Sequence, residues 1–97
     1  MIWLKDQNDV NKAVDGLRKN KTLLAISDII YGDLLVTEGY GVPKTDSAVP
    51  DIIIVPELGV IYTSSTSKIA EHGGFSSNDR NVACLASIPS LKKQVFT

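Results

Sequence analysis

Near the N-terminus, the apolar residues recur with the period of a helix. Four of them follow the spacing i, i+3, i+4, i+7, namely Val10, Ala13, Val14 and Leu17. This spacing places their side chains on one face of an α-helix. Asp6 or Asn8 can cap the first turn, because a short polar side chain accepts a hydrogen bond from a free backbone N–H. The pattern predicts a helix over about residues 7–19, after a short strand "MIWL" at residues 1–4.

The middle of the chain carries the clearest strand signal. Residues 51–56 read "DIIIVP", an unbroken apolar run rich in β-branched side chains. Such a run indicates burial on both faces, as in the middle of an α/β sheet. The segment "ELGVIYT" follows through a turn at residues 57–59. We therefore expect residues 51–63 to form a β-hairpin.

Weaker patterns complete the predicted order of elements. "TLLAISDII" predicts a strand over about residues 23–30, and one or two helical turns are expected near residues 33–38. "NVACLASIP" predicts a last strand at residues 81–89. The expected fold class is mixed α/β (α+β), with a small mixed sheet and one clear N-terminal helix. The length of 97 residues predicts a single small domain spanning residues 1–97.

Composition narrows the classes of function. With 43% apolar and 22% charged residues, the chain has the composition of a globular protein rather than a disordered one. A net charge of -1 argues against a nucleic-acid partner, which needs a concentrated basic surface. No apolar run approaches the ~20 residues needed to span a membrane, and no signal peptide is recognisable. These patterns leave the localisation open.

The single cysteine, Cys84, lies within the apolar run "VACLASI". A lone cysteine cannot form an intramolecular disulfide, so the redox compartment of the protein stays open. Its apolar neighbours predict a buried, unreactive thiol.

Candidate chemistry concentrates in "AEHGGFSSNDRNVACL", which contains the only histidine, His72. Two following glycines allow a sharp turn and leave space around the imidazole, as a metal ligand or a general acid–base group requires. A zinc site, however, needs three or four converging ligands. The nearest carboxylates in the sequence are Glu71 and Asp79, and neither is well placed by spacing. Local chemistry alone therefore favours an exposed loop histidine without a role.

The other polar groups give weaker signals. Asn78 and Asp79 favour a turn, with the charges of Asp79 and Arg80 in solvent. The hydroxyls of "SSTS" at residues 64–67 lack an orienting acid and an oxyanion hole, so a nucleophilic site is a poor interpretation. Phe75 is expected to anchor the loop.

A longer pattern changes this balance. "VPDIIIVPELGVIYTSSTSKIAEHGGFSSNDRNVACLASIPSL" resembles the C-terminal part of the alkaline phosphatase superfamily, in its branch of type I phosphodiesterases and nucleotide pyrophosphatases. The matching pieces are "PDIIIVPELG", "EHGGF", "SSNDR" and "VACLASI" within residues 49–91, with a looser likeness upstream. In that superfamily two divalent metal ions, usually zinc, clamp a phosphoryl group. The histidine of the late "HG" motif is a metal ligand, and this role falls on His72. The resemblance also implies that Gly73 and Gly74 let the backbone approach the metal centre.

The resemblance also implies what this chain lacks. The family's other metal ligands and its Thr or Ser nucleophile lie upstream, and no second histidine is present. We therefore expect a partial alkaline-phosphatase-like subdomain, the C-terminal portion of a larger metallohydrolase. It would be inactive alone and would need Zn²⁺ and an upstream catalytic portion to act on a phosphoester. Open sheet edges would also allow a homodimer.

Two alternatives stay open at this point. The chain could be a stand-alone α/β binding or structural module with no catalytic role. It could also be a stand-alone metal-binding domain that uses His72 with Asp79 or with a second copy of the chain.

Overall fold

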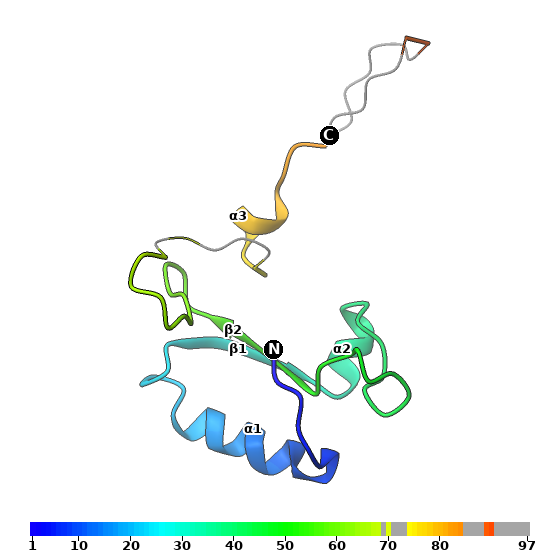
Figure 1. The fold of residues 1–97 in the computed structure, drawn as a ribbon, viewed down its shortest axis with the longest axis vertical. Helices are drawn as coiled ribbons and strands as arrows, with labels where there is room; N and C mark the ends of the chain where they lie inside the picture. Colours follow the sequence, from blue (N-terminus) through cyan, green and yellow to red (C-terminus); the bar gives the residue numbers. More distant parts are fainter. Residues whose placement is uncertain (69, 71–73, 85–88, 91–97) are drawn as a thin grey trace.

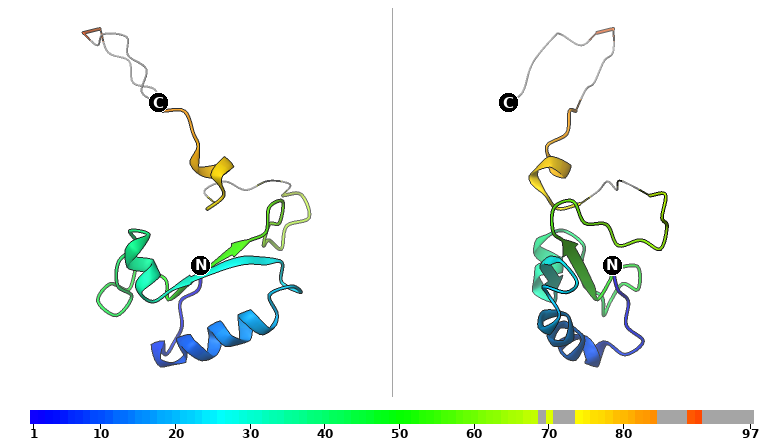
Figure 2. Two further views of the ribbon diagram at one scale, coloured as in Figure 1. Left: turned by 180° about the vertical axis from the view of Figure 1, so that it is seen from behind. Right: turned by 90° about the vertical axis from the view of Figure 1, so that its left-hand side faces the viewer.

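A computed structural model of the chain describes residues 1–68, 70, 74–84 and 89–90. It shows a small mixed α/β fold, as the sequence predicted (Figure 1). The elements in chain order are a short 3₁₀-helix η1 (Gln7–Asp9), α1 (Val10–Lys19), β1 (Ile26–Tyr31), α2 (Asp33–Thr37), β2 (Ile52–Pro56) and α3 (Ser77–Arg80). In every view α1 and α3 lie on opposite sides of the sheet (Figure 1 and Figure 2).

The predicted N-terminal helix is confirmed as η1 followed directly by α1. The Asp6 carboxylate caps its start by accepting a 2.9 Å hydrogen bond from the Asn8 N–H. The apolar face packs inward, so that Val14 is almost completely buried. On the outer side, Arg18 donates a 3.0 Å hydrogen bond to the Tyr31 hydroxyl and thereby ties α1 to the end of β1.

The sheet consists of β1 and β2, which pair antiparallel with Tyr31 opposite Ile52 and Asp28 opposite Val55. The predicted hairpin over residues 51–63 is wrong, because β2 pairs with the distant β1 and residues 57–63 form no strand. Pairing with β1 brings Ile29 and Ile30 into the core. A local hairpin would have offered β2 little apolar surface beyond Val60 and Ile61.

Both faces of β2 are covered, as its unbroken apolar run predicted. Ile52 packs in a first cluster with α1, together with Val14, Ile26 and Ile29. Ile53 points to the opposite face and packs in a second cluster with Ile30 and Leu35 of α2. Successive residues of a strand point to opposite faces, so an apolar run here serves two clusters at once. It does not mark the middle strand of a larger sheet, since the described sheet has two strands.

The first residues of the chain make a single bridge rather than the predicted strand. Ile2 pairs antiparallel with Ile52, through N–H to carbonyl distances of 2.8 and 3.2 Å. Two residues later, the Leu4 N–H donates to the buried Asp51 carboxylate at 2.7 Å. These bonds hold the N-terminal segment against the start of β2.

After β2 the chain turns at residues 57–59, as predicted, with Gly59 at a φ of 84° and the Val60 N–H donating to the Glu57 carbonyl. Tyr62 then fixes the returning chain, because its hydroxyl donates to the Leu24 carbonyl at 2.5 Å. Partial burial of that hydroxyl raises the pKa of Tyr62 above its ordinary value, and the nearby Glu57 carboxylate adds to the effect.

Two sequence predictions fail near the C-terminal end of the described chain. Cys84 is exposed rather than buried. Residues 81–84 form no strand, and residues 85–88 of the predicted last strand lie outside the described residues. In the described part of the chain, no helix is long and apolar enough to cross a membrane.

Candidate functional site

The candidate site is the segment around the H-G-G motif. His72 lies outside the described residues, together with Glu71 and Gly73. Its role as a metal ligand therefore stays a prediction. The structure describes the two flanks of the motif, Ala70 on one side and residues 74–84 on the other, and these define the local geometry.

The C-terminal flank is held by the short helix α3. The Ser76 hydroxyl accepts a hydrogen bond from the Asp79 N–H at 3.2 Å and donates one to the Asp79 carboxylate at 2.6 Å. A serine before a helix with an acidic residue three positions later is a typical N-terminal cap. Asn78 and Asp79 therefore lie in a short helix rather than in the predicted turn, and the Asp79 carboxylate is bonded to Ser76.

The second glycine of the motif is in close contact with that carboxylate. A Cβ atom built on Gly74 would lie 2.5 Å from Asp79 Oδ2, which is closer than non-bonded atoms approach. Only glycine therefore fits at this position without moving Asp79. The resemblance implied an approach of Gly74 to a metal centre. The described residues show an approach to the Asp79 carboxylate of α3 instead.

Aromatic and charged side chains attach the same flank to the core. The Phe75 ring packs on the second cluster, with its centroid 6.2 Å from that of Tyr40, so its predicted anchoring role is confirmed. Arg80 covers this ring at 5.3 Å and bonds the Glu38 carboxylate at 2.9 Å. Arg80 is thus paired, unlike the solvated charge that the sequence suggested. This ion pair joins α2 to α3, because Glu38 follows α2 and Arg80 ends α3.

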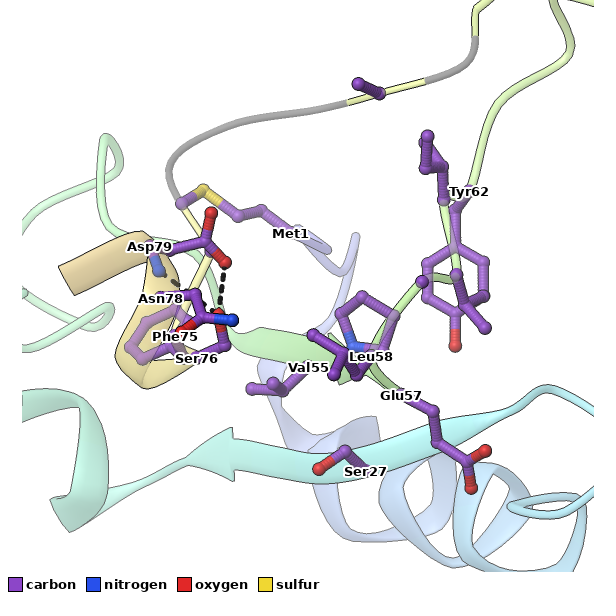
Figure 3. A pocket seen from close by; sticks show the side chains of 16 residues that line it. Met1, Ser27, Val55, Glu57, Leu58, Tyr62, Phe75, Ser76, Asn78 and Asp79 are labelled. Atoms are coloured by element: carbon purple, nitrogen blue, oxygen red, sulfur yellow. Dashed lines mark hydrogen bonds between the residues drawn. The ribbon is translucent and has the colours of Figure 1, made fainter. Parts of the chain in front are cut away.

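A hollow of about 690 Å³ lies beside this flank (Figure 3). One wall is formed by Ser76, Asn78 and Asp79, and the opposite wall by Leu58 and Tyr62. The Met1 side chain reaches between them. Ala70 and Gly74 both line the hollow, so both described flanks of the H-G-G motif border the same space. We call this space the loop hollow.

The described residues do not by themselves fit a zinc ion. Among them, no three His, Cys, Asp or Glu side chains lie close enough together to hold a metal. Zinc needs three or four such ligands, so a site at this loop needs donors beyond the described ones. The serines of "SSTS" add none, since Ser65 and Ser67 bond each other at 3.1 Å.

Sequence reasoning missed Glu38, Tyr40 and Tyr62 as partners of this region. Glu38 is 42 positions from Arg80, and Tyr62 is 38 positions from the carbonyl it bonds. No local pattern could reveal these pairs, because each depends on the pairing of β1 with β2. One hint was available: a tyrosine in a glycine-rich turn, such as Tyr40, often has a packing partner elsewhere in the chain.

No family model, curated protein or solved structure matches the chain. The functional interpretation therefore rests on the motif pattern of residues 49–91 and on the geometry of the loop.

Proposed function

We propose that this chain forms the C-terminal portion of a metal-dependent phosphodiesterase or phosphatase, resembling the type I phosphodiesterase branch of the alkaline phosphatase superfamily. In this proposal, His72 is one ligand of a two-zinc centre. An upstream catalytic portion supplies the other ligands and the nucleophile. The chain alone is inactive toward phosphoesters.

The observation that carries the proposal is the position of the two flanks of the H-G-G motif. Ala70 and Gly74 border one hollow, and the C-terminal flank is held to the core through Phe75 and Arg80. A metal ligand must be held in place by its surroundings, because the binding geometry tolerates little error. A flank fixed by an aromatic contact and an ion pair meets this requirement better than a free surface turn does.

The crowding at Gly74 supports the same interpretation. A side chain at Gly74 would displace the Asp79 carboxylate, so a glycine here preserves the Ser76–Asp79 contact beside the motif. Asp79 and Ser76 then act as supports that shape the end of the motif.

Hydrolysis of a chromogenic phosphodiester in the presence of Zn²⁺ tests the proposal. We expect no turnover from the 97-residue chain, and turnover once it is joined to the upstream portion. In the joined protein, His72→Ala should lower turnover at least about 100-fold, since even indirect supports of metal ligands are worth about 10–100-fold. Ser77→Ala is the matched control, because Ser77 is an exposed residue close by, at the start of α3.

Two results would contradict the proposal. Turnover by the 97-residue chain that is lost in His72→Ala would show that the chain is active without a partner. Unchanged turnover of His72→Ala in the joined protein would remove the histidine from the metal centre. The second result would favour the stand-alone binding or structural module.

A further inference from the structure

The outer edge of β2 is paired at only one position. Ile2 and Ile52 exchange both of their backbone hydrogen bonds, so the N–H and C=O of Ile52 point away from β1. Along an antiparallel strand, the backbone N–H and C=O of every second residue point to the same edge of the strand. Those of Ile54 therefore also point outward. No hydrogen bond between them and another described residue outside the β1–β2 ladder is present.

The outer edge of β1 differs from this one. Ile29 lies opposite Ile54, so its N–H points outward on the far side of the sheet. There the Asp28 carboxylate accepts a hydrogen bond from it at 2.7 Å. A charged side chain that satisfies its own strand's edge is a known protection against pairing with further strands. The sheet thus has one protected edge and one edge where, among the described residues, the Ile54 N–H and C=O have no partner.

The loop hollow lies at this end of β2. It is lined by Val55 and Pro56 of β2 and by Met1. A strand in line with Ile2 would run antiparallel to β2. The residue before Met1 would then pair with Ile54, and the third residue before Met1 would lie opposite Pro56.

We infer that β2 accepts an extended strand at Ile54, in line with Ile2, and that this strand belongs to the upstream portion named in the proposed function, on which this inference rests. The residues that precede Met1 are the natural occupant, because the Ile2–Ile52 bridge already fixes the direction and register of a strand continuing from Ile2. The strand would satisfy the Ile54 N–H and C=O and would border the loop hollow beside Met1.

A second copy of the chain fits this edge poorly. Two β2 edges paired antiparallel about Ile54 would place Ile52 of each copy opposite Pro56 of the other. Ile52 is already bonded to Ile2, and Pro56 has no N–H to donate. Only the two bonds between the Ile54 residues would remain.

Amide hydrogen exchange tests the inference on the complete 97-residue chain. In the unextended chain, we expect the Ile54 amide to exchange faster than those of Ile53 and Val55, which point toward β1. A four-residue extension Thr-Val-Thr-Val before Met1 serves as the probe, because β-branched residues favour strands. It should slow exchange at Ile54 roughly fivefold to tenfold, as the net contribution of one hydrogen bond predicts.

The control extension Thr-Pro-Thr-Pro has the same length, but its prolines stand where the strand's N–H groups would face β2, and proline at such positions keeps a strand out of the ladder. It should leave Ile54 exchange unchanged, and Ile29 should not respond to either extension. Equal exchange of Ile54 with both extensions would overturn the inference. So would slower exchange at rising concentration of the unextended chain, which would make this edge a contact between copies. Neither readout involves zinc or His72, so failure here is distinguishable from failure of the proposed function.

Discussion

The two halves of the described chain are held together in different ways. Up to Ile53 the chain forms two apolar clusters around a pair of strands, and several of its side chains are almost completely buried. After Ile53 no described residue is buried. Beyond β2 the described chain is attached through a backbone hydrogen bond of Glu57 and through single side chains, namely Tyr62, Phe75 and Arg80.

This contrast separates a framework from the loops it carries. The framework owes its stability to burial of apolar surface, which is the dominant favourable contribution to folding. The loops depend on a few directional contacts, so they can change locally without unfolding the framework. The candidate chemistry lies in the loops, where most functional side chains of proteins are found.

The largest effect is expected from a cavity in the framework. Ile52 is fully buried in the first cluster, so Ile52→Ala should lower the free energy of unfolding by about 2–5 kcal/mol. That is a large share of the ~5–15 kcal/mol typical of a domain. Leu58→Ala in the turn after β2 is the control, because Leu58 is 82% exposed and should change stability by less than about 0.5 kcal/mol. Urea denaturation of both variants measures their unfolding free energies. Equal losses of stability would contradict the contrast between the buried framework and the exposed turn.

A smaller effect is expected where Tyr62 attaches the loop to the framework. Tyr62→Phe removes the hydrogen bond to the Leu24 carbonyl and should cost about 1 kcal/mol of unfolding free energy. Tyr40→Phe is the control, since no hydrogen bond of the Tyr40 hydroxyl is present among the described residues. Chemical denaturation near neutral pH compares the two variants, and equal stability of Tyr62→Phe and wild type would contradict the attachment.

The same tyrosine predicts a dependence on pH. Burial, and secondly the Glu57 carboxylate, raise the pKa of Tyr62 in the folded state above its ordinary value of 10.0. The stabilisation from this shift is complete below the unfolded pKa and is lost as the pH rises through the folded pKa. Between about pH 8 and about pH 11, wild type should therefore lose more stability than Tyr62→Phe. Parallel loss in both proteins would contradict the shift.

Two glycine substitutions sharpen the contrast further. Gly16 lies in α1 with open space around it, so Gly16→Ala should stabilise the chain by about 0.5–1 kcal/mol. Gly74→Ala should give no such gain, because the new Cβ meets the Asp79 carboxylate. Thermal unfolding measures the stability of both variants. For Gly74→Ala, NMR spectra should also show loss of the Ser76–Asp79 contact. A gain in stability from Gly74→Ala would contradict the crowding.

The smallest effect is expected from the exposed ion pair. Glu38→Gln weakens the contact with Arg80 and should lower global stability by only about 0.2–1 kcal/mol. Its local effect should be larger, with faster amide exchange across residues 74–80. Asp15→Asn removes a longer, 3.9 Å exposed pair with Arg18 in α1 and should leave residues 74–80 unchanged. Identical exchange profiles for the two variants would show that the ion pair does not hold the loop.

The framework was largely predictable because its signals are local. The spacing of Val10 to Leu17 gave α1, and the run at residues 52–55 gave β2 with both of its faces covered. The partner of β2 was not predictable from its own sequence. Its apolar run suits a local hairpin and a distant strand equally well, and the choice depends on how much apolar surface each arrangement buries.

The sequence pointed to a candidate residue, whose role stays a prediction, but it did not reveal the side chains that support the loop. The motif pattern singled out His72, and the composition of the loop indicated that Phe75 would anchor it. The pair of Glu38 with Arg80 could not be foreseen, since it exists only after α2 and α3 are placed on the same side of the sheet. Cys84 shows the opposite failure. Its apolar neighbours indicated burial, yet neighbours in sequence do not bury a side chain unless an element packs over it, and Cys84 is exposed.

Titration of the 97-residue chain with Zn²⁺, followed by calorimetry and by the NMR signals of the His72 imidazole, tests the central claim most directly. A chain that supplies one ligand of a shared centre should bind zinc more weakly than micromolar, with the response centred on that imidazole and lost in His72→Ala. Stoichiometric binding tighter than micromolar would contradict the account, because it would show that the chain completes a metal site without an upstream portion. An imidazole signal that does not respond to zinc would contradict it as well.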